Sequence, residues 1–495
     1  MSNDNIGVSD KIASTVRGLM DAGSADRDLN KAFETARSNA GSDPESAYLY
    51  GLFLYTGNGA ERDRKGALEA FNTASEGGFG PATIVKDEIG RNSEAVQDAL
   101  MDLRFRAECA DDKACKEIFS LYDTGKNPDG SRADVRKDHA EAIRLYMPCA
   151  DKGDKDAQNT IGFMYLMGKG VPKDHELALK LLKASAEAGC AKAAYRLGYM
   201  YDTGQGDSEQ DLDEAVVWYR RGADLGDPEA QYQLAGILSM KDSKYYNVTK
   251  SNEYLTKAAE QGQIEAAHQL GLMYAYGSNG VRRNVDKAKK FLIKSCEGGY
   301  DQAMVDYANM CFEGQVLPQD LETAAKWFQA AAAHFNGIAQ YALGCMYGNG
   351  YYYKQDNEEA AKWFEEAAEG GEPNAQYAIG CFYYEGRGVA KDLKKAVAWF
   401  QESADQGHPG AMSFMAMFLI NGHGIEQDVK GGLEMLNKVA ESGYPEAQYY
   451  LGRIYAEGEY VKQDLSIAKK LLTKAANQGD PDAADYLAKL KKSKK

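Results

Sequence analysis

The sequence predicts an all-α protein, a right-handed α-solenoid of stacked antiparallel helix pairs. Residues 337–372 are followed by a 36-residue segment, 373–408, that repeats most of the same pattern. Glycine-rich turns separate segments of helix length throughout the chain. With 495 residues, the chain is too long for one ordinary compact core. Internal repetition with a period between 20 and 50 residues is typical of solenoids.

A small residue recurs every 36 or 37 residues from the middle of the chain onward. Its positions are Gly162, Gly198, Ala235, Gly271, Ala308, Gly344, Gly380, Ala416 and Gly452. Glycine inside a helix costs roughly 1 kcal/mol relative to alanine, so its recurrence implies a compensating gain in packing. We expect the two helices of each pair to approach closely there. The large residues expected to fill the facing space are Met164, Met200, Met273, Met310, Met346 and Phe382 from the first helix, and Trp218, Trp327, Trp363 and Trp399 from the second.

The junctions between repeats carry signals for both ends of a helix. Gly371-Glu372-Pro373 and Gly407-His408-Pro409 are two of five such junctions. Glycine favours the left-handed conformation that ends a helix, and proline is tolerated in the first turn of the next one. Because the connections are short, sequence neighbours are expected to pack antiparallel.

The chain divides into four predicted parts. Residues 1–44 form an N-terminal helical cap, and residues 45–156 form divergent repeats with a longer loop near 125–138. Residues 157–480 form nine regular repeats of 36–37 residues, and residues 481–495 form a C-terminal capping helix with a basic tail.

Within the divergent part, residues 79–113 lack the glycine turn. They keep the apolar spacing of a helix, so a helical pair is expected there as well.

The repeat pattern A-x-Y-x-L-G-x-x-Y-x-x-G-x-G-V-x-x-D-x-x-K-A-x-x-W-[FY]-x-x-A-A-x-x-G resembles that of the Sel-one-like repeat (SLR) family. Residues 375–407 match it almost position for position. The resemblance implies a tetratricopeptide-like solenoid (SLR/TPR-like superhelix). It also implies a scaffold or adaptor role, because family members commonly assemble protein complexes.

The amino-acid composition limits the class of partner and the cellular location that we expect. The formal net charge of −16 disfavours nucleic acid, which requires a positive surface, and a basic or apolar partner fits better. No run of about 18 apolar residues predicts a membrane span, and the first residues show no signal-peptide pattern. The eight cysteines form no C-x-x-C motif, so reduced thiols and a cytoplasmic location are expected.

No motif in the chain indicates catalysis, a metal or a cofactor. The turn Gly386-Arg387-Gly388 and its counterparts join two helices in each repeat, whereas a phosphate loop follows a strand. The six histidines are scattered singly, with no pair at metal-ligand spacing. We therefore expect no enzyme activity.

The alternative, implied by some members of the family, is a secreted cysteine-rich hydrolase (β-lactamase-like) or cell-wall binder. Such members carry a disulfide in almost every repeat. Here Cys109 and Cys115 are the only closely spaced pair.

The favoured function is a non-enzymatic protein–protein interaction scaffold that binds a peptide or protein segment on its concave surface. The first helix of each pair is expected to line that surface. Its positions 4, 7 and 11 vary between repeats, while neighbouring positions stay small or apolar. This variation marks a binding surface or, alternatively, reflects only the free variation of solvent-exposed positions. The candidate residues at these positions are Phe163, Arg196, Tyr199, Leu272, Tyr276, Phe414, Met417, Tyr450 and Arg453.

Two turns depart from the pattern. Tyr351, Tyr352 and Tyr353 replace the usual turn in one repeat, and residues 239–249, with Tyr245 and Tyr246, replace it in another. Each is a candidate for an exposed aromatic anchor, and the alternative is that each folds back over its own helix pair.

Overall fold

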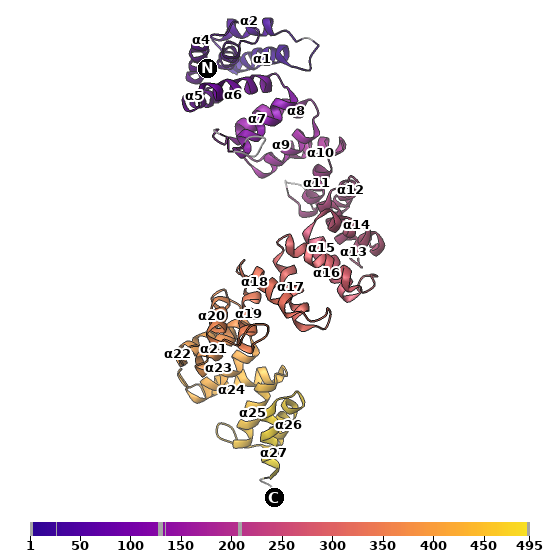
Figure 1. Ribbon diagram of the computed structural model, residues 1–495, viewed down its shortest axis with the longest axis vertical. Coiled ribbons are helices and arrows are strands. Elements are labelled where there is room, and N and C mark those ends of the chain that lie inside the picture. The colour runs from indigo at the N-terminus through magenta and orange to yellow at the C-terminus, as the bar shows by residue number, and fades with distance from the viewer. Residues whose placement is uncertain (1–2, 26, 127–131, 134, 206–209, 493–495) are drawn as a thin grey trace. The chain divides into compact units, whose positions relative to one another are not determined.

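The described residues of the protein form an all-α array of helix pairs, as the sequence predicts. The computed structural model describes residues 3–25, 27–126, 132–133, 135–205 and 210–492 (Figure 1). These residues form 27 helices and no β-strand, with one isolated bridge between Lys126 and Arg132. The helices belong to two units, residues 1–261 and 262–495.

The first unit holds the N-terminal cap, the divergent repeats and the first regular repeats. Its helices are α1 (Asn3–Met20), α2 (Leu29–Asn39), α3 (Pro44–Thr56), α4 (Arg64–Glu76), α5 (Gly80–Arg91), α6 (Glu94–Glu108), α7 (Asp112–Thr124), α8 (His139–Asp151), α9 (Lys155–Met167), α10 (His175–Glu187), α11 (Ala191–Thr203), α12 (Leu212–Asp224), α13 (Pro228–Ser239) and α14 (Val248–Gln261). The pair α5 and α6 confirms the prediction for residues 79–113. Of the predicted long loop, residues 127–131 and 134 lie outside the described residues.

The second unit continues the regular repeats. Its helices are α15 (Ile264–Tyr276), α16 (Val285–Glu297), α17 (Asp301–Glu313), α18 (Leu321–Ala332), α19 (Gly337–Asn349), α20 (Asn357–Glu369), α21 (Pro373–Glu385), α22 (Leu393–Asp405), α23 (Pro409–Asn421), α24 (Val429–Glu441), α25 (Pro445–Glu457), α26 (Leu465–Asn477) and α27 (Pro481–Lys492). Odd-numbered helices from α7 onward are the first helices of their repeats, and even-numbered ones are the second helices.

Local signals define both ends of these helices. Asp392 caps α22 by accepting hydrogen bonds from the backbone N–H groups of Lys394 and Lys395, at 3.0 Å each. An aspartate side chain caps α20 and α26 in the same way. The first helix α21 ends on Gly386, whose φ of 77° is the left-handed conformation that glycine adopts without strain.

The recurring small residue brings the two helices of a pair together, as predicted. A Cβ on Gly380 would lie 2.8 Å from two ring atoms of Phe400, so only glycine fits against that ring. Gly198 meets Tyr219 and Gly344 meets Phe364 in the same way.

The prediction of the large residues that face the glycines is correct only in part. The six residues expected from the first helices are all buried. On the second helix, however, the ring against the glycine belongs to the residue after the tryptophan. Trp218 and Trp327 are buried beside it, whereas Trp363 and Trp399 are only half-buried. Adjacent helix residues point about 100° apart, so only one of the two rings can face the partner helix.

A second glycine in the turn lets successive repeats approach each other. A Cβ on Gly388 would lie 2.0 Å from the carbonyl oxygen of Asn357, at the start of α20 in the preceding repeat. The turn therefore rests directly on backbone, which no other residue would allow.

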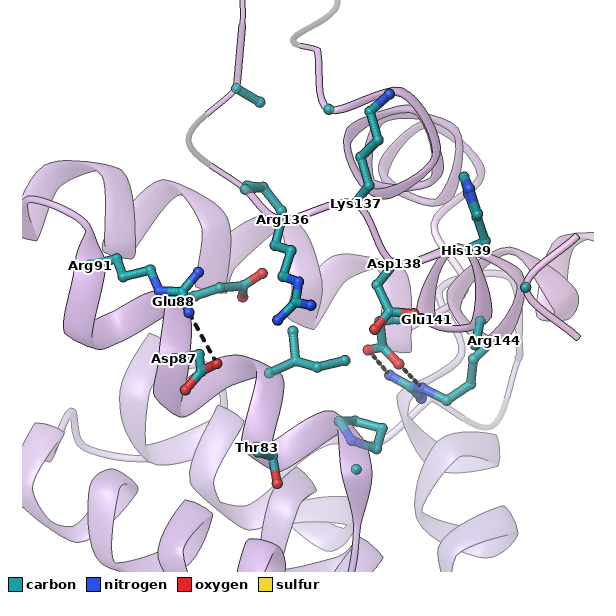
Figure 2. Close-up of a pocket in the computed structure, with 18 of the residues that line it drawn as sticks. Thr83, Asp87, Glu88, Arg91, Arg136, Lys137, Asp138, His139, Glu141 and Arg144 are labelled. Carbon is teal, nitrogen blue, oxygen red and sulfur yellow. Dashed lines mark hydrogen bonds and ion pairs between the residues drawn. The ribbon is translucent and has the colours of Figure 1, made fainter.

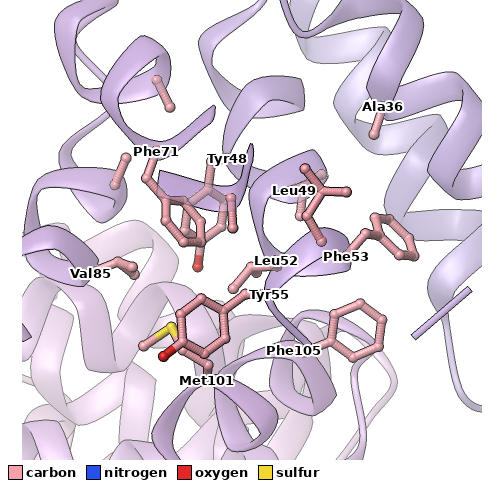
Figure 3. Packing of buried hydrophobic residues seen from close by; sticks show 14 of the residues in the cluster. Ala36, Tyr48, Leu49, Leu52, Phe53, Tyr55, Phe71, Val85, Met101 and Phe105 are labelled. Carbon is pink, nitrogen blue, oxygen red and sulfur yellow. The ribbon is translucent and has the colours of Figure 1, made fainter. Parts of the chain in front are cut away.

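The core of the first unit is densest around α3, which is buried on nearly every side. Figure 3 shows Tyr48, Leu52 and Phe53 of this helix among side chains from α4, α5 and α6. The rings of Phe53 and Phe105 meet edge to face, with centroids 5.3 Å apart. Helices from the N-terminal cap and the divergent repeats thus share one core.

Candidate protein-binding site

First helices of several neighbouring repeats contact each other directly, and we call the side of the repeats that they form the first-helix row. In the first unit, α11 contacts α13, and in the second unit α19 contacts α21, and α23 and α25 each contact the next first helix. The second helices of these repeats do not approach each other as closely. A stack that is tighter on one side curves toward that side. The first-helix row is therefore the inner side at these junctions.

In the first unit, the structure brings together two of the predicted binding residues. The guanidinium of Arg196 lies over the ring of Phe163, 3.9 Å from its centroid. Arg196 Nη1 also donates to the backbone oxygen and to Oδ1 of Asn159, at 3.0 and 2.8 Å. Burial lowers the pKa of Arg196 to about 10. Tyr199 is exposed beside them. Arg196 is thus a charged group held in place by its own chain.

Leu272 and Tyr276 on α15 are not part of a cluster. Leu272 is half-buried and packs against the core of its unit. The Tyr276 side chain is 60% exposed.

Four predicted residues lie on two consecutive first helices of the second unit. Phe414 and Met417 belong to α23, and Tyr450 and Arg453 belong to α25. All four are half-buried. The Phe414 ring stacks on the buried ring of Phe400, with centroids 4.9 Å apart.

Arg453 lies toward the far end of the same face. Its Nε is 3.6 Å from Oε1 of Glu457. The hydroxyl of Tyr486 donates to the same carboxylate oxygen at 3.1 Å. Arg453 is therefore at ion-pair distance from Glu457, although its Nε makes no hydrogen bond among the described residues.

The three consecutive tyrosines divide between the two expectations. Tyr353 folds back and stacks on Tyr347, with centroids 4.3 Å apart. Tyr351 and Tyr352 remain 46% and 52% exposed. Tyr352 has a φ of 64° at the place of the second turn glycine.

The other unusual turn also has one covered and one exposed tyrosine. The Tyr245 hydroxyl donates to Oδ1 of Asp213 at 2.6 Å, and its ring packs against a cluster of α12, from the preceding repeat, and α13. Tyr246 is exposed.

Glu446 was not singled out by the sequence analysis, and its carboxylate lies on α25 with Tyr450 and Arg453. Burial, with a contribution from Asp480, raises the pKa of Glu446. Burial is also the main cause that raises the pKa of Tyr450 and of Tyr444 to about 12, and the Glu446 charge adds to it. The pKa of Cys381 on α21 rises to about 12 for the same reasons, with Glu385 contributing as well.

One sequence signal could have revealed this carboxylate. Glu446, Tyr450, Arg453 and Glu457 follow the i, i+4, i+7, i+11 spacing of one helix face. The contributions of α21 could not be found in this way, because that helix belongs to a repeat two repeats earlier in the chain.

A second missed feature is a buried ionic network in the first unit. Arg104 on α6 is fully buried and pairs with Glu141 of α8. It also donates to the hydroxyls of Tyr48 and Tyr122. Tyr122 in turn donates to Oε1 of Glu88 at 2.6 Å.

The network continues through Glu108, the last residue of α6. Its two oxygens accept hydrogen bonds from Arg144 at 2.6 Å and from Arg17 at 3.0 Å. Burial opposes ionisation of Glu108, but these two guanidinium groups outweigh it and lower its pKa well below the usual range. The network thus ties α1, α6 and α8 together.

A cavity of about 1490 Å³ lies beside this network, between α5, the segment before α8 and α8 itself. Figure 2 shows Glu88 and Arg136 at one side of it and Glu141 and Arg144 at the other. Burial raises the pKa of Glu88 despite the nearby Arg104. Arg144 and Glu141 are joined by a hydrogen bond of 2.8 Å. Much of the charge that lines the cavity is thus already paired within the network.

The described part of the chain offers no group of three or more His, Cys, Asp or Glu side chains that could hold a metal ion. Among the same residues, no helix is both long and apolar enough to cross a membrane.

Comparison with protein families decides the identity. The model of the Sel1 repeat matches eleven segments, which are residues 44–79, 121–154, 155–190, 191–227, 228–263, 264–300, 301–334, 337–372, 373–408, 409–444 and 445–480. The chain belongs to the Sel1 repeat family. The matched segments contain α3 and α4 and the helices from α8 to α26, whereas α5, α6, most of α7 and α27 lie outside them.

One known structure has a similar fold. The crystal structure of c5321, a protective antigen of uropathogenic Escherichia coli with an SLR fold, has a TM-score of 0.65 and 24% identity. It covers 94% of this chain and 91% of its own. This likeness shows the fold alone.

Two curated relatives match only in part. The DAP3-binding cell death enhancer 1 of Rattus norvegicus is 40% identical over 167 residues, which are 34% of this chain and 32% of the relative. The chitin synthase regulator SKT5 of Malassezia restricta is 28% identical over 144 residues, which are 28% of this chain and 10% of the relative. The Sel1 chain therefore spans less than a third of the length of either relative.

Proposed function

We propose that this Sel1 repeat protein is a non-enzymatic scaffold that binds a segment of a partner protein along the first-helix row of its second unit. One observation carries the proposal. Phe414, Met417, Tyr450 and Arg453 occupy the variable positions of consecutive first helices and form one half-exposed face. Aromatic and arginine side chains dominate the energy of protein interfaces.

The architecture supports an extended contact. In a solenoid each repeat touches only its neighbours, so a row of helices offers a long surface for one partner segment. Sel1 solenoids are typical of protein-interaction scaffolds. One relative is itself named for binding another protein.

We also propose a cytoplasmic location. The eight cysteines are unpaired in the structure, and six of them are buried. The alternative of a secreted, disulfide-stapled hydrolase gains no support from this arrangement.

Site-specific photo-cross-linking in native lysate tests the scaffold proposal. A benzoylphenylalanine at Met417 should cross-link a discrete partner. The same group at Lys430, an 88% exposed side chain on the second helix α24, should not. Replacing Tyr450 by serine in the Met417 cross-linking protein should abolish the product, because the partner loses a neighbouring anchor.

Equal cross-linking from Met417 and Lys430 would contradict the proposed surface. So would a Met417 product that survives Tyr450→Ser in a folded protein.

A further inference from the structure

The carboxylate of Glu446 is covered by protein but has no partner. Its Oε2 is buried and accepts no hydrogen bond among the described residues. Burial and the charge of Asp480 raise its pKa, because both disfavour the ionised form. The residue as a whole is half-buried. A buried anion without a counter-charge is costly unless something pairs with it.

Tyrosines from two first helices, α21 and α25, and from the junction before α25 lie near enough to this carboxylate for its charge to raise their pKa. Tyr444 precedes α25 and Tyr450 follows Glu446 by one turn. Tyr377 of α21 faces the same charge, which adds to burial in raising the pKa of Tyr377. The centroid of the Tyr377 ring lies 6.0 Å from that of Phe414 on α23.

Gly410 of α23 leaves room for this arrangement. A Cβ there would lie 3.0 Å from the Tyr377 ring and 3.0 Å from the Tyr444 hydroxyl. Gly410 occupies the position in its repeat that Glu446 occupies in the next. At this place α23 therefore presents only backbone, whereas α21 and the junction before α25 contribute the side chains of Tyr377 and Tyr444.

We propose that Glu446, with Tyr377, Tyr444 and Tyr450, receives a cationic side chain, arginine or lysine, of the partner segment. This inference rests on the proposed function and adds the chemistry of the partner. A carboxylate provides a charge-assisted hydrogen bond, and tyrosine faces attract cations by their quadrupole. A neutral or acidic partner would leave the carboxylate unpaired as the interface closes over it.

The charge of the chain favours the same class of partner. The formal net charge is −16, which attracts basic segments over a distance and accelerates their association. The nearby cation Arg453 lies at ion-pair distance from Glu457 and is not among the groups that shift the pKa of Glu446.

Labelled twelve-residue peptides test the inference on the full chain. Four pools share a mixture of uncharged residues, and their central position is fixed as arginine, lysine, citrulline or glutamine. By fluorescence anisotropy, the arginine or lysine pool should bind roughly tenfold more tightly than the two neutral pools, since a hydrogen bond to a charged group contributes about 1.5–3 kcal/mol. The tighter of the two cationic pools identifies the preferred side chain.

Glu446→Gln should erase this preference while the thermal transition stays in place. Glu434→Gln is the matched control, because it removes one negative charge from an exposed position on the second helix α24. It should leave the preference intact. Gly410→Ala, which fills the space between Tyr377 and Tyr444, should weaken the cationic pools more than the neutral ones.

Two results would overturn the inference in different ways. Binding of all pools without cation preference, or a preference that survives Glu446→Gln, would remove the cation site but leave the scaffold proposal standing. No binding of any pool, together with no cross-link from Met417, would overturn both.

Discussion

At the scale of single residues, Gly380 shows how the absence of one methyl group sets the spacing of a helix pair. Replacement by alanine would place Cβ 2.8 Å from the Phe400 ring and force the ring or the helix to move. Overpacking of this kind typically costs about 1–3 kcal/mol. We expect faster amide hydrogen exchange across α21 and α22 in Gly380→Ala.

A compensating change is available within the same chain. The corresponding residues of the next repeat are Ala416 and Leu436, which lie together in its core. Gly380→Ala combined with Phe400→Leu should therefore recover most of the lost protection. If the double variant loses as much protection as the two single variants added together, the contact between residues 380 and 400 does not set the spacing.

Phe335 adopts a backbone conformation that is unfavourable for a residue with a side chain. It has a φ of 61° and is 87% exposed, at a junction where the other regular repeats of the second unit place glycine. The left-handed conformation costs roughly 1–2 kcal/mol for a residue with a Cβ. Phe335→Gly should raise the stability of α18 and α19 by about that amount, measured by hydrogen exchange.

Phe335→Ala is the control for this prediction. It removes the ring but keeps the Cβ, so the stability should change little. An equal gain from both substitutions would assign the effect to the exposed ring instead of to the backbone.

At the scale of helices, Glu108 joins α6 to α1 and α8. Glu108→Gln removes the charge that Arg17 and Arg144 share and leaves two guanidinium groups short of a partner. Breaking one partner of a buried ion pair costs about 3–5 kcal/mol. The first unit of this variant should melt at a lower temperature at neutral pH.

The pH dependence of this effect has a definite sign. The pKa of Glu108 is lowered in the folded state from an ordinary value of 4.5. Its contribution is therefore complete above that value and is lost as the pH falls through the folded-state pKa. The difference in melting temperature between wild type and Glu108→Gln should be constant from pH 6 to 8 and shrink below about pH 4.5. A difference that grows toward acid would contradict the ionic role.

Helices and their pairing were predictable from the sequence because their signals are local. The glycine before Pro373 and the aspartate cap at Asp392 act within a few residues. The choice of Phe400 over Trp399 as the ring that meets Gly380 depends on the rotation of one helix against another, which the repeat pattern alone does not give.

The candidate site was predictable only in part for a related reason. Phe414 and Tyr450 stood out by variation between repeats. Glu446 matters through its neighbours, and Tyr377 joins it from two first helices earlier in the chain. Similarly, Arg104 and Glu141 form part of an ionic network because α6 and α8 meet in space, which no short motif reports.

At the scale of the whole molecule, a solenoid transmits a local loss of stability over a short range only. Its stability is approximately a sum of repeat terms and nearest-neighbour terms. Glu108→Gln should therefore accelerate hydrogen exchange in α1–α8 and leave α15–α27 at the wild-type rate. A uniform increase along all described helices would mean that the chain unfolds as one cooperative block.

The close contact of each first-helix glycine, such as Gly344 with Phe364, lies inside a single repeat. A duplication or deletion of one 36-residue unit in the gene would therefore carry both halves of the contact together, and the length of the array could change without a packing mismatch. The face around Glu446 could not gain or lose a repeat in this way, because α21, α23 and α25 come from three consecutive repeats. An insertion between any two of them would separate the carboxylate from its tyrosines. Homologous chains should therefore differ in repeat number outside residues 373–457 more readily than within them.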